Sequence, residues 1–310
     1  MRLRGFQVGD GAAIVDAWQQ AMPRDPITAE RFRDLVLLDP NFDADGLRVA
    51  EVDGRVVGAV AAMRRQVAME GGDLEPEHGW ITFAFVDPAV RRRGVGSGLL
   101  SNAFDWLRER GATQVHFSPY TPNYLLPGLD ATAYPEGRAL LERFGFTTRY
   151  EAVAMERDLT AYEPPHLEAR NGYDFGTPET DELPALIGLA RQFSADWARA
   201  IRESLAQGSP LERIVVARGA ARELVGWAMH GTYANAIERF GPFGVHPSQR
   251  GAGLGRILLH RTLARMRAAG ATKAWFLWTT ADSPAGHLYT KAGFRVTRNF
   301  QVMTATLTET

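Results

Sequence analysis

The feature that most constrains this chain is a glycine-rich segment that occurs twice, 159 positions apart. The first copy covers residues 86–100 and the second covers residues 245–259. In each copy an apolar, strand-like segment leads into a turn with three glycines and then into an amphipathic helix. The register continues through the Gly-Ala-Thr sequences at residues 111–113 and 270–272. We therefore interpret the chain as one domain that has been duplicated.

The length of 310 residues fits two domains of about 150 residues each. We predict an N-terminal domain over residues 1–159, a linker over 160–170 and a C-terminal domain over 171–310. The register breaks in one place: Gly145 matches Gly293 at a shift of only 148, so the first copy carries 11 more residues. The extra residues fall around 120–134, a stretch rich in proline, glycine and aromatic residues that is typical of an extended loop.

Hydrophobic periodicity predicts the same order of elements in both halves. In the first half we expect strands at 3–8, 47–52, 55–63, 80–86, 115–118 and 152–159, with helices at 10–22, from a Thr28 cap, at 98–110 and at 136–144. In the second half we expect strands at 173–176, 214–217, 224–230, 240–245, 274–279 and 296–307, with helices at 179–191, 195–207, 254–268 and 285–292. This order predicts the α+β class, with a mixed, mostly antiparallel sheet and helices on both faces in each tandem copy.

Composition narrows the class of protein. The chain has no cysteine, which excludes disulfides, thiolate zinc sites and a cysteine nucleophile, and we expect no metal site. The formal net charge of −1 gives no global field for nucleic acid or an anionic membrane. Residues 1–5 precede no apolar run, and no apolar stretch approaches membrane-spanning length. A cytoplasmic protein is therefore expected.

The glycine turns predict an anion site, because a helix start carries unpaired N–H groups and partial positive charge. Neither turn supplies the lysine of a Walker loop, and each G-x-G is followed three residues later by leucine, which departs from the dinucleotide fingerprint. The pattern that is intact in both copies is R-x-x-G-x-G, each time preceded by Val-x-Pro.

This pattern resembles the pyrophosphate-binding motif of the GNAT superfamily of acyl-coenzyme A N-acyltransferases. A later family motif is matched by residues 288–294, and the order of elements is similar over nearly the whole chain. The resemblance implies that acetyl-coenzyme A, or another acyl-coenzyme A, binds at the turns and along the preceding strands. The residues implied are Val86, Arg91, Arg92, Arg93, Gly94, Val95, Gly96 and Ser97 in the first copy, with Ala84 on the strand, and Phe243, Val245, Arg250, Gly251, Ala252, Gly253, Leu254, Gly255 and Arg256 in the second.

The resemblance also suggests the acid and the base of the reaction. Tyr289 takes the place of the family's tyrosine near the coenzyme A sulfur, whereas Leu141 holds that place in the first half. Glu238 is the candidate base, and the histidines His230 and His78 are weaker candidates. With no cysteine, direct attack in a ternary complex is expected.

The strand before the second turn contains Gly241 and Pro242, which predict a β-bulge, whereas residues 82–85 predict a more regular strand in the first half. We therefore expect the second domain to be the transferase. The predicted function is transfer of an acetyl or other short acyl group to an amine of a small-molecule or peptide-like acceptor. The alternatives are a non-catalytic acyl-coenzyme A sensor or scaffold and, less favoured, a binder of some other phosphate ligand.

Overall fold

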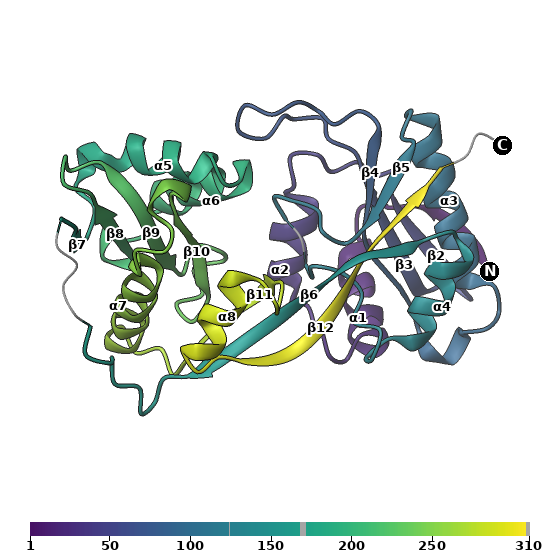
Figure 1. Ribbon diagram of the computed structural model, residues 1–310. Helices are drawn as coiled ribbons and strands as arrows, with labels where there is room; N and C mark the ends of the chain where they lie inside the picture. The colour runs from purple at the N-terminus through teal and green to yellow at the C-terminus, as the bar shows by residue number, and fades with distance from the viewer. Residues whose placement is uncertain (124, 168–171, 308–310) are drawn as a thin grey trace. The chain divides into compact units, whose positions relative to one another are not determined.

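The computed structural model describes residues 1–123, 125–167 and 172–307 of the 310-residue chain. The chain folds into two compact units. Unit 1 comprises Met1–Ala68, Asp73–Ala152 and Asn299–Thr310, and unit 2 comprises Met69–Gly72 and Val153–Arg298. The two long strands in Figure 1, β6 (Thr147–Asp158) and β12 (Arg295–Thr306), each begin in one unit and end in the other.

Unit 1 is built on a mixed sheet with the strand order β1-β2-β3-β4-β5-β12. Neighbouring strands are antiparallel, except that β4 and β5 are parallel, as the strand–turn–helix–strand pattern predicts. Its elements, apart from β12 and the first half of β6, are β1 (Arg2–Gly5), α1 (Asp10–Ala21), α2 (Ala29–Phe32), β2 (Leu47–Val52), β3 (Arg55–Met63), β4 (His78–Val86), α3 (Val95–Glu109), β5 (Gln114–Phe117) and α4 (Pro135–Arg143).

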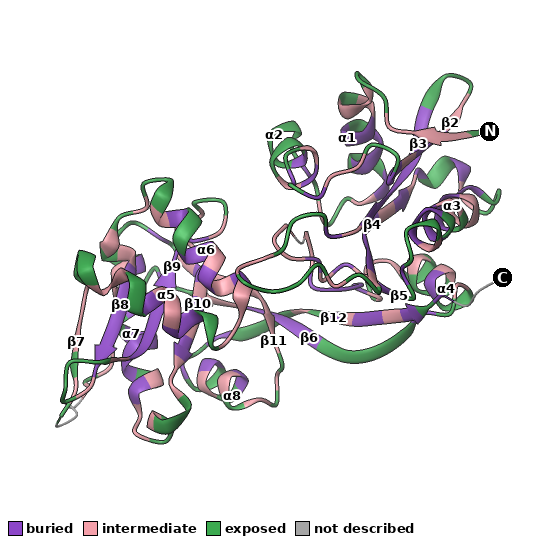
Figure 2. Ribbon diagram, turned by 90° about the horizontal axis from the view of Figure 1, so that it is seen from above, coloured by how far each residue is buried: buried purple, intermediate pink, exposed green. Residues whose placement is uncertain are grey.

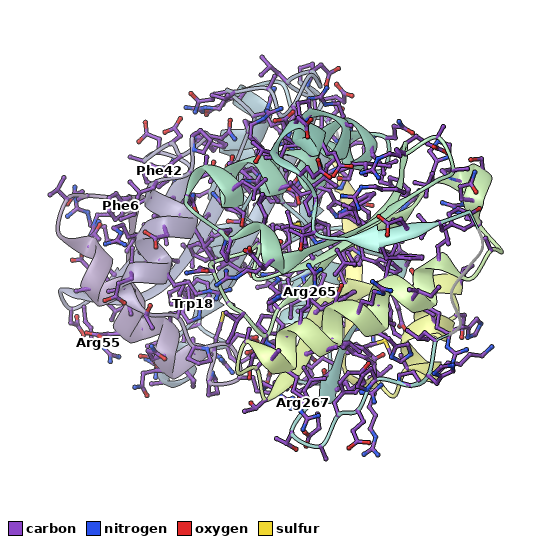
Figure 3. All side chains as sticks on the ribbon, turned by 90° about the vertical axis from the view of Figure 1, so that its left-hand side faces the viewer. Phe6, Trp18, Phe42, Arg55, Arg265 and Arg267 are labelled. Atoms are coloured by element: carbon purple, nitrogen blue, oxygen red, sulfur yellow. The ribbon has the colours of Figure 1, made fainter. Side chains whose placement is uncertain are left out.

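Helices cover both faces of the unit 1 sheet, which confirms the predicted architecture. On one face, α3 packs Leu99 and Leu107 into a core that also contains Ile81 of β4. On the other face, the Trp18 ring of α1, labelled in Figure 3, lies 4.7 Å from the Phe83 ring, centroid to centroid. The sheet therefore separates two apolar cores, each closed by an amphipathic helix.

Unit 2 repeats this plan. Its sheet has the order β10-β9-β8-β7, and β11 pairs antiparallel with the second half of β6. A single parallel bridge, between Arg239 and Trp275, joins the start of β10 to β11. Its elements are β7 (Asp174–Gly176), α5 (Leu183–Arg191), α6 (Ala195–Ala206), β8 (Ile214–Arg218), β9 (Leu224–His230), β10 (Phe240–Val245), α7 (Leu254–Ala268), β11 (Lys273–Thr279) and α8 (Pro284–Lys291).

The strands β8 and β9 form the centre of unit 2 and are coloured as buried in Figure 2. Trp227 faces α5 and α6, whereas Ala228 and Val215 face the core that α7 closes. Arg265 of α7, labelled in Figure 3, donates from Nη1 to the Ile214 carbonyl at 2.7 Å and so ties the helix to β8. The glycine turn before α7 directly follows β10, the strand at one end of the order β10-β9-β8-β7.

Because β6 and β12 each pass from one unit to the other, the boundaries of the compact units differ from the boundaries of the sequence repeat. Residues 303–306 of β12 pair with β5 in unit 1, and residues 153–158 of β6 pair with β11 in unit 2. The structure therefore divides the chain at residues 152 and 298, besides the short segment 69–72, whereas the repeat divides it at 159 and 171. The predicted boundaries stay a prediction about the repeat, and parts of the predicted linker and C-terminal domain (168–171 and 308–310) lie outside the described residues.

Candidate active site

In unit 2, the turn between β10 and α7 presents backbone N–H groups without an acceptor. Gly251 and Gly253 have φ angles of +84° and +79°, which glycine adopts without strain. The helix makes its first main-chain bond from Arg256 to the Gly253 carbonyl at 3.2 Å. Within the described part of the chain, no acceptor faces the N–H groups of Gly251, Gly253, Leu254 and Gly255. The turn therefore fits an anion such as phosphate.

The turn in unit 1 has the same backbone conformation although its sequence differs. Arg92 and Gly94, which match Gly251 and Gly253, have φ angles of +63° and +82°. The first helical bond runs from Gly98 to the Gly94 carbonyl at 2.9 Å. Among the residues that the structure covers, the N–H groups from Arg92 to Ser97 have no acceptor. Both copies therefore keep the backbone of an anion-binding turn.

The first arginine of the motif has different surroundings in the two units. The Arg91 guanidinium donates from Nε to the Val86 carbonyl at 3.1 Å and from Nη2 to the Ala21 carbonyl at 3.2 Å. Its main-chain N–H is also used, within the turn. Arg250 is exposed, and its side chain has no hydrogen-bond partner among the described residues. Arg91 therefore anchors the turn to β4 and α1, whereas Arg250 is available to a ligand.

The last glycine of each motif permits close helix packing. A Cβ atom placed on Gly96 would lie 2.9 Å from a methyl carbon of Leu140 on α4. A Cβ atom on Gly255 would lie 3.3 Å from Leu288 of α8 and 3.3 Å from the Phe243 ring. These glycines let the helix that carries the acid position approach the first turn of the preceding helix.

Both strands that lead into the turns contain a bulge. In β10 the register against β9 shifts between Phe240 and Phe243, so that Gly241 and Pro242 replace one residue, as the sequence predicts. In β4 the register against β3 shifts around Thr82, which corresponds to Gly241. The expectation of a more regular strand in the first half is therefore wrong. A bulge depends on register between strands, and threonine adopts it without the glycine–proline signal.

Tyr289 lies in an aromatic cluster beside the bulged strand. Its side chain is 8% exposed, and its hydroxyl makes no hydrogen bond with any described residue. The Phe276 and Phe243 rings lie 4.5 and 6.2 Å from its ring, centroid to centroid. Burial raises the pKa of Tyr289, so its hydroxyl stays protonated at neutral pH. In unit 1 the buried Leu141 occupies the corresponding place and offers no proton.

The base candidates occupy other positions. Glu238 precedes β10, and its Oε1 accepts hydrogen bonds from the Thr272 N–H at 3.2 Å and hydroxyl at 2.8 Å. Among the described residues, no hydrogen bond joins Glu238 to Tyr289. Over the same residues, Oε2 of Glu238 has no hydrogen-bond partner. His230 is buried with its Nδ1 2.9 Å from the Ile237 carbonyl, and burial lowers its pKa. His78 Nδ1 lies 2.6 Å from His116 Nε2.

In unit 1 the space beside the end of the β4–β5 pairing is filled by side chains that satisfy one another. Trp80 lies there, and the fully buried Tyr120 ring packs 5.6 Å from it, centroid to centroid. The Tyr120 hydroxyl donates to Asp39 at 2.8 Å and accepts from Asn41 at 2.7 Å. The Arg65 guanidinium lies over the Trp80 ring at 4.9 Å. The predicted loop 120–134 begins in this network, and its residue 124 lies outside the described residues.

Unit 2 has a charged cluster at the corresponding place. Arg239, which matches Trp80, lies 4.3 Å from the Tyr233 ring and 5.5 Å from the Trp275 ring. The Tyr233 hydroxyl donates to Asp196 at 3.2 Å, and Arg199 also donates to Asp196. The sequence analysis did not identify this cluster. The sequence signal that could have identified it is the difference at one equivalent position, where the second copy has Arg239 and the first copy has Trp80.

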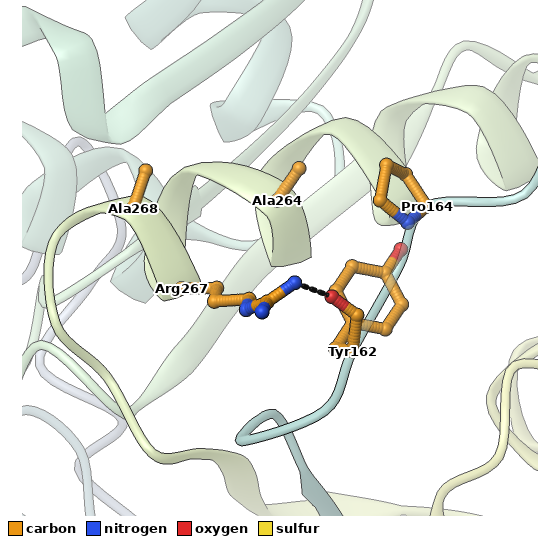
Figure 4. A pocket seen from close by; sticks show the side chains of 5 residues that line it. All are labelled: Tyr162, Pro164, Ala264, Arg267 and Ala268. Carbon is orange, nitrogen blue, oxygen red and sulfur yellow. Dashed lines mark hydrogen bonds between the residues drawn. The ribbon is translucent and has the colours of Figure 1, made fainter.

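One further cavity, shown in Figure 4, has a volume of about 320 Å³ and lies at the end of α7 away from the turn. It is lined by Tyr162, Pro164, Ala264, Arg267 and Ala268, and Arg267 donates a hydrogen bond to the Tyr162 carbonyl. No cluster of metal-ligating side chains occurs in the described residues. Over the same residues, no helix is both long and apolar enough to span a bilayer.

Comparison with known proteins matches both halves of the chain. The model of the acetyltransferase (GNAT) family matches residues 12–124, and the model of the acetyltransferase (GNAT) domain matches residues 210–296. A mycothiol acetyltransferase from Nocardia farcinica is 28% identical over 312 residues, which cover 91% of this chain and 94% of the relative.

Solved structures share the fold. A GCN5-related N-acetyltransferase from Sphaerobacter thermophilus is 17% identical with a TM-score of 0.75, over 99% of this chain and 96% of the other. A tandem GNAT protein from the clavulanic acid biosynthesis pathway is 17% identical with a TM-score of 0.69, over 100% of this chain and 99% of the other. Each glycine turn described above lies within a matched segment.

Proposed function

This chain belongs to the GNAT family of acetyltransferases, with two such domains in tandem, and we propose that unit 2 performs the transfer while unit 1 retains the binding turn. As a member of this family, the protein is an N-acetyltransferase that moves an acetyl group from an acyl-coenzyme A to an amine. The predicted enzyme class is therefore confirmed, and it replaces the alternative of a non-catalytic binder.

Acetyltransferases of this fold use acetyl-coenzyme A, and the residues of the unit 2 turn fit its pyrophosphate. The unbonded N–H groups of Gly251, Gly253, Leu254 and Gly255 supply hydrogen bonds at a helix start. In this proposal, Phe243 and Val245 line the pantetheine arm, and Arg250 and Arg256 add charge from the exposed rim. In unit 1, residues 92–97 would hold the same group, with Arg91 as an anchor and Val86 on the strand.

The chemistry that we propose for unit 2 is direct attack by the acceptor. The amine nitrogen bonds to the acyl carbon and loses a proton, and the carbon–sulfur bond breaks. Tyr289 gives its hydroxyl proton to the departing sulfur; burial keeps this hydroxyl protonated before the transfer, although the raised pKa also makes it a weaker acid. For the base, Glu238 stays a prediction, with Oε2 as the oxygen able to accept a proton.

The observation that carries the assignment to unit 2 is the contrast between Tyr289 and Leu141. Both units have the turn and the bulge, so neither feature separates them. They differ at the acid position and also at the candidate base, because Gly79 takes the place of Glu238 in unit 1. The filled space around Trp80 and Tyr120 further supports the proposal, because it leaves unit 1 little room for an acceptor.

The test pairs equivalent variants in the two turns. Gly94→Asp and Gly253→Asp each place a carboxylate at a helix start, and at Gly94 no atom lies within 4 Å of a new Cβ. Aspartate is among the residues found most often at positive φ apart from glycine, so the backbone strain is small and equal in the two variants, and its charge repels phosphate. We expect acetyl-coenzyme A turnover to be lost in Gly253→Asp and retained in Gly94→Asp, whose calorimetric titration should lose one of two binding sites. Loss of turnover in Gly94→Asp alone would reverse the assignment.

A second test concerns the acid. Tyr289→Phe removes one hydroxyl from the aromatic cluster and leaves the ring contacts in place. We expect kcat to fall by about 10²-fold with little change in the affinity for acetyl-coenzyme A. The acceptor is proposed to be a small-molecule amine, and because a relative is named mycothiol acetyltransferase, mycothiol-related amines belong in the first acceptor screen. An unchanged kcat in Tyr289→Phe would remove Tyr289 from the mechanism.

A further inference from the structure

The bulge in β10 is tied to the loop between β9 and β10 by one buried side chain. Thr232 lies two residues after the end of β9 and is 9% exposed. Its hydroxyl donates a hydrogen bond to the Gly241 carbonyl at 3.0 Å. Gly241 is the bulged residue, and its φ of +105° is accessible chiefly to glycine. The side chain therefore fixes the peptide group that has left the strand ladder.

The direction of that carbonyl matters for the chemistry proposed for unit 2. Beyond the Arg239–Trp275 bridge, β10 no longer pairs with β11, and the thioester is expected between the separated strands. A carbonyl oxygen turned into this space would repel the acyl oxygen, on which negative charge develops. Pro242 has no N–H, so the amides of Gly241 and Phe243 are the donors that remain at the bulge. A bond to Thr232 holds the Gly241 carbonyl on the loop instead.

In unit 1 the structure describes no equivalent of this hydrogen bond. The residue two positions after the end of β3, as Thr232 is after β9, is Arg65, and the residue that matches Gly241 is Thr82. Within the described residues, no side chain donates a hydrogen bond to the Thr82 carbonyl, and the Arg65 guanidinium donates to the Thr121 carbonyl instead. The tie is thus confined to the unit that also carries Tyr289, although both units share the bulge itself.

We infer that Thr232 is a positioning residue for acyl transfer: it holds the Gly241 carbonyl away from the reacting centre and keeps the bulge amides aligned. This inference rests on the proposal that unit 2 is the transferase. It assigns Thr232 no direct contact with either substrate. Its effect should therefore fall on the chemical step rather than on the binding of the coenzyme A body.

The experiment compares Thr232→Val, Thr232→Ser and Thr262→Val in the full chain. Thr262→Val is the matched control, because Thr262 is fully buried in α7 and donates to the Leu258 carbonyl at 2.9 Å. The measurements are kcat, the KM for acetyl-coenzyme A, and the ratio of the affinities for acetyl-coenzyme A and free coenzyme A. The ratio reports contacts to the acyl group alone.

For Thr232→Val we expect kcat to fall about 10- to 100-fold, a lower affinity ratio and little change in the affinity for free coenzyme A. Thr232→Ser should restore most of kcat, and Thr262→Val should retain it. An unchanged kcat and ratio in Thr232→Val, or an equal loss in Thr262→Val, would overturn the inference. If the unaltered protein transfers no acetyl group, or its turnover depends on Gly94 and not on Gly253, the proposed function itself fails.

Discussion

The passage of β12 into unit 1 leads to a prediction opposite to the one that the sequence repeat alone would give. Met303 belongs to the second sequence copy, yet it is 1% exposed in the core of unit 1. It pairs with Phe117 of β5, and the same core contains Ile81 and Leu107. Met303→Ala should therefore destabilise unit 1 and leave the core of unit 2 intact.

The size of the effect follows from burial. Truncation of a fully buried methionine to alanine costs about 2–5 kcal/mol, the sum of lost transfer free energy and a residual cavity. For a unit of this size, that corresponds to a fall of roughly 5–20 °C in Tm. Hydrogen exchange locates the loss: the amides of β5, including Val115, should lose protection, whereas those of β8 and β9 should keep theirs.

Met266→Ala is the matched control. Met266 is fully buried in α7 and belongs to the core of unit 2. Its truncation should cost a similar free energy but should expose β8 and β9 to exchange rather than β5. If Met303→Ala instead loosened β8 and β9 and spared β5, the pairing of β12 with β5 would be refuted.

Other features of the chain make shorter predictions. Arg92→Gly should stabilise the protein by about 0.5–1 kcal/mol, because Arg92 has a φ of +63°, and a lower urea midpoint would contradict this. Burial lowers the pKa of His116 and of His260 to about 4, so the unfolded state binds more protons and stability should fall as pH drops from 6.5 towards 4; the double variant His116→Asn/His260→Asn should flatten this pH dependence in urea titrations. Glu70 forms ion pairs with arginines of α5 and α6, so Glu70→Gln should increase proteolysis at residues 69–72. Unchanged cleavage would show that these ion pairs do not protect the segment.

Most of the fold could be predicted from local sequence pattern. The predicted ranges 47–52, 55–63, 224–230, 240–245 and 254–268 coincide with β2, β3, β9, β10 and α7. These elements have turn or cap residues at their ends and a clear alternation of apolar positions. The strand β6 was less predictable and begins five residues earlier than expected, at Thr147. The exchange of β6 and β12 has no local signal, because either copy's strand would satisfy the same pattern.

The parts of the site in which a motif fixes the backbone were predictable from the sequence. The parts that depend on tertiary contacts of side chains were not. The glycine turns follow from spacing: α7 begins after Gly253 as expected, whereas α3 begins after Gly94, three residues before the expected residue 98. The role of Arg91 was not predictable, since its acceptors are carbonyls that the fold brings near. Thr232 lies in a loop without any motif, and its importance depends on one contact with Gly241.

The proposed assignment suggests how a duplicated domain can lose catalysis more readily than binding. The turn and the bulge are properties of the backbone, and they persist although Arg92 replaces a glycine and Thr82 replaces Gly241. The proposed acid is the one hydroxyl group of Tyr289, and unit 1 has Leu141 in its place. Anion binding by main-chain N–H groups thus tolerates substitutions that end proton transfer. We expect unit 1 to bind coenzyme A for this reason, whether or not it accommodates an acceptor.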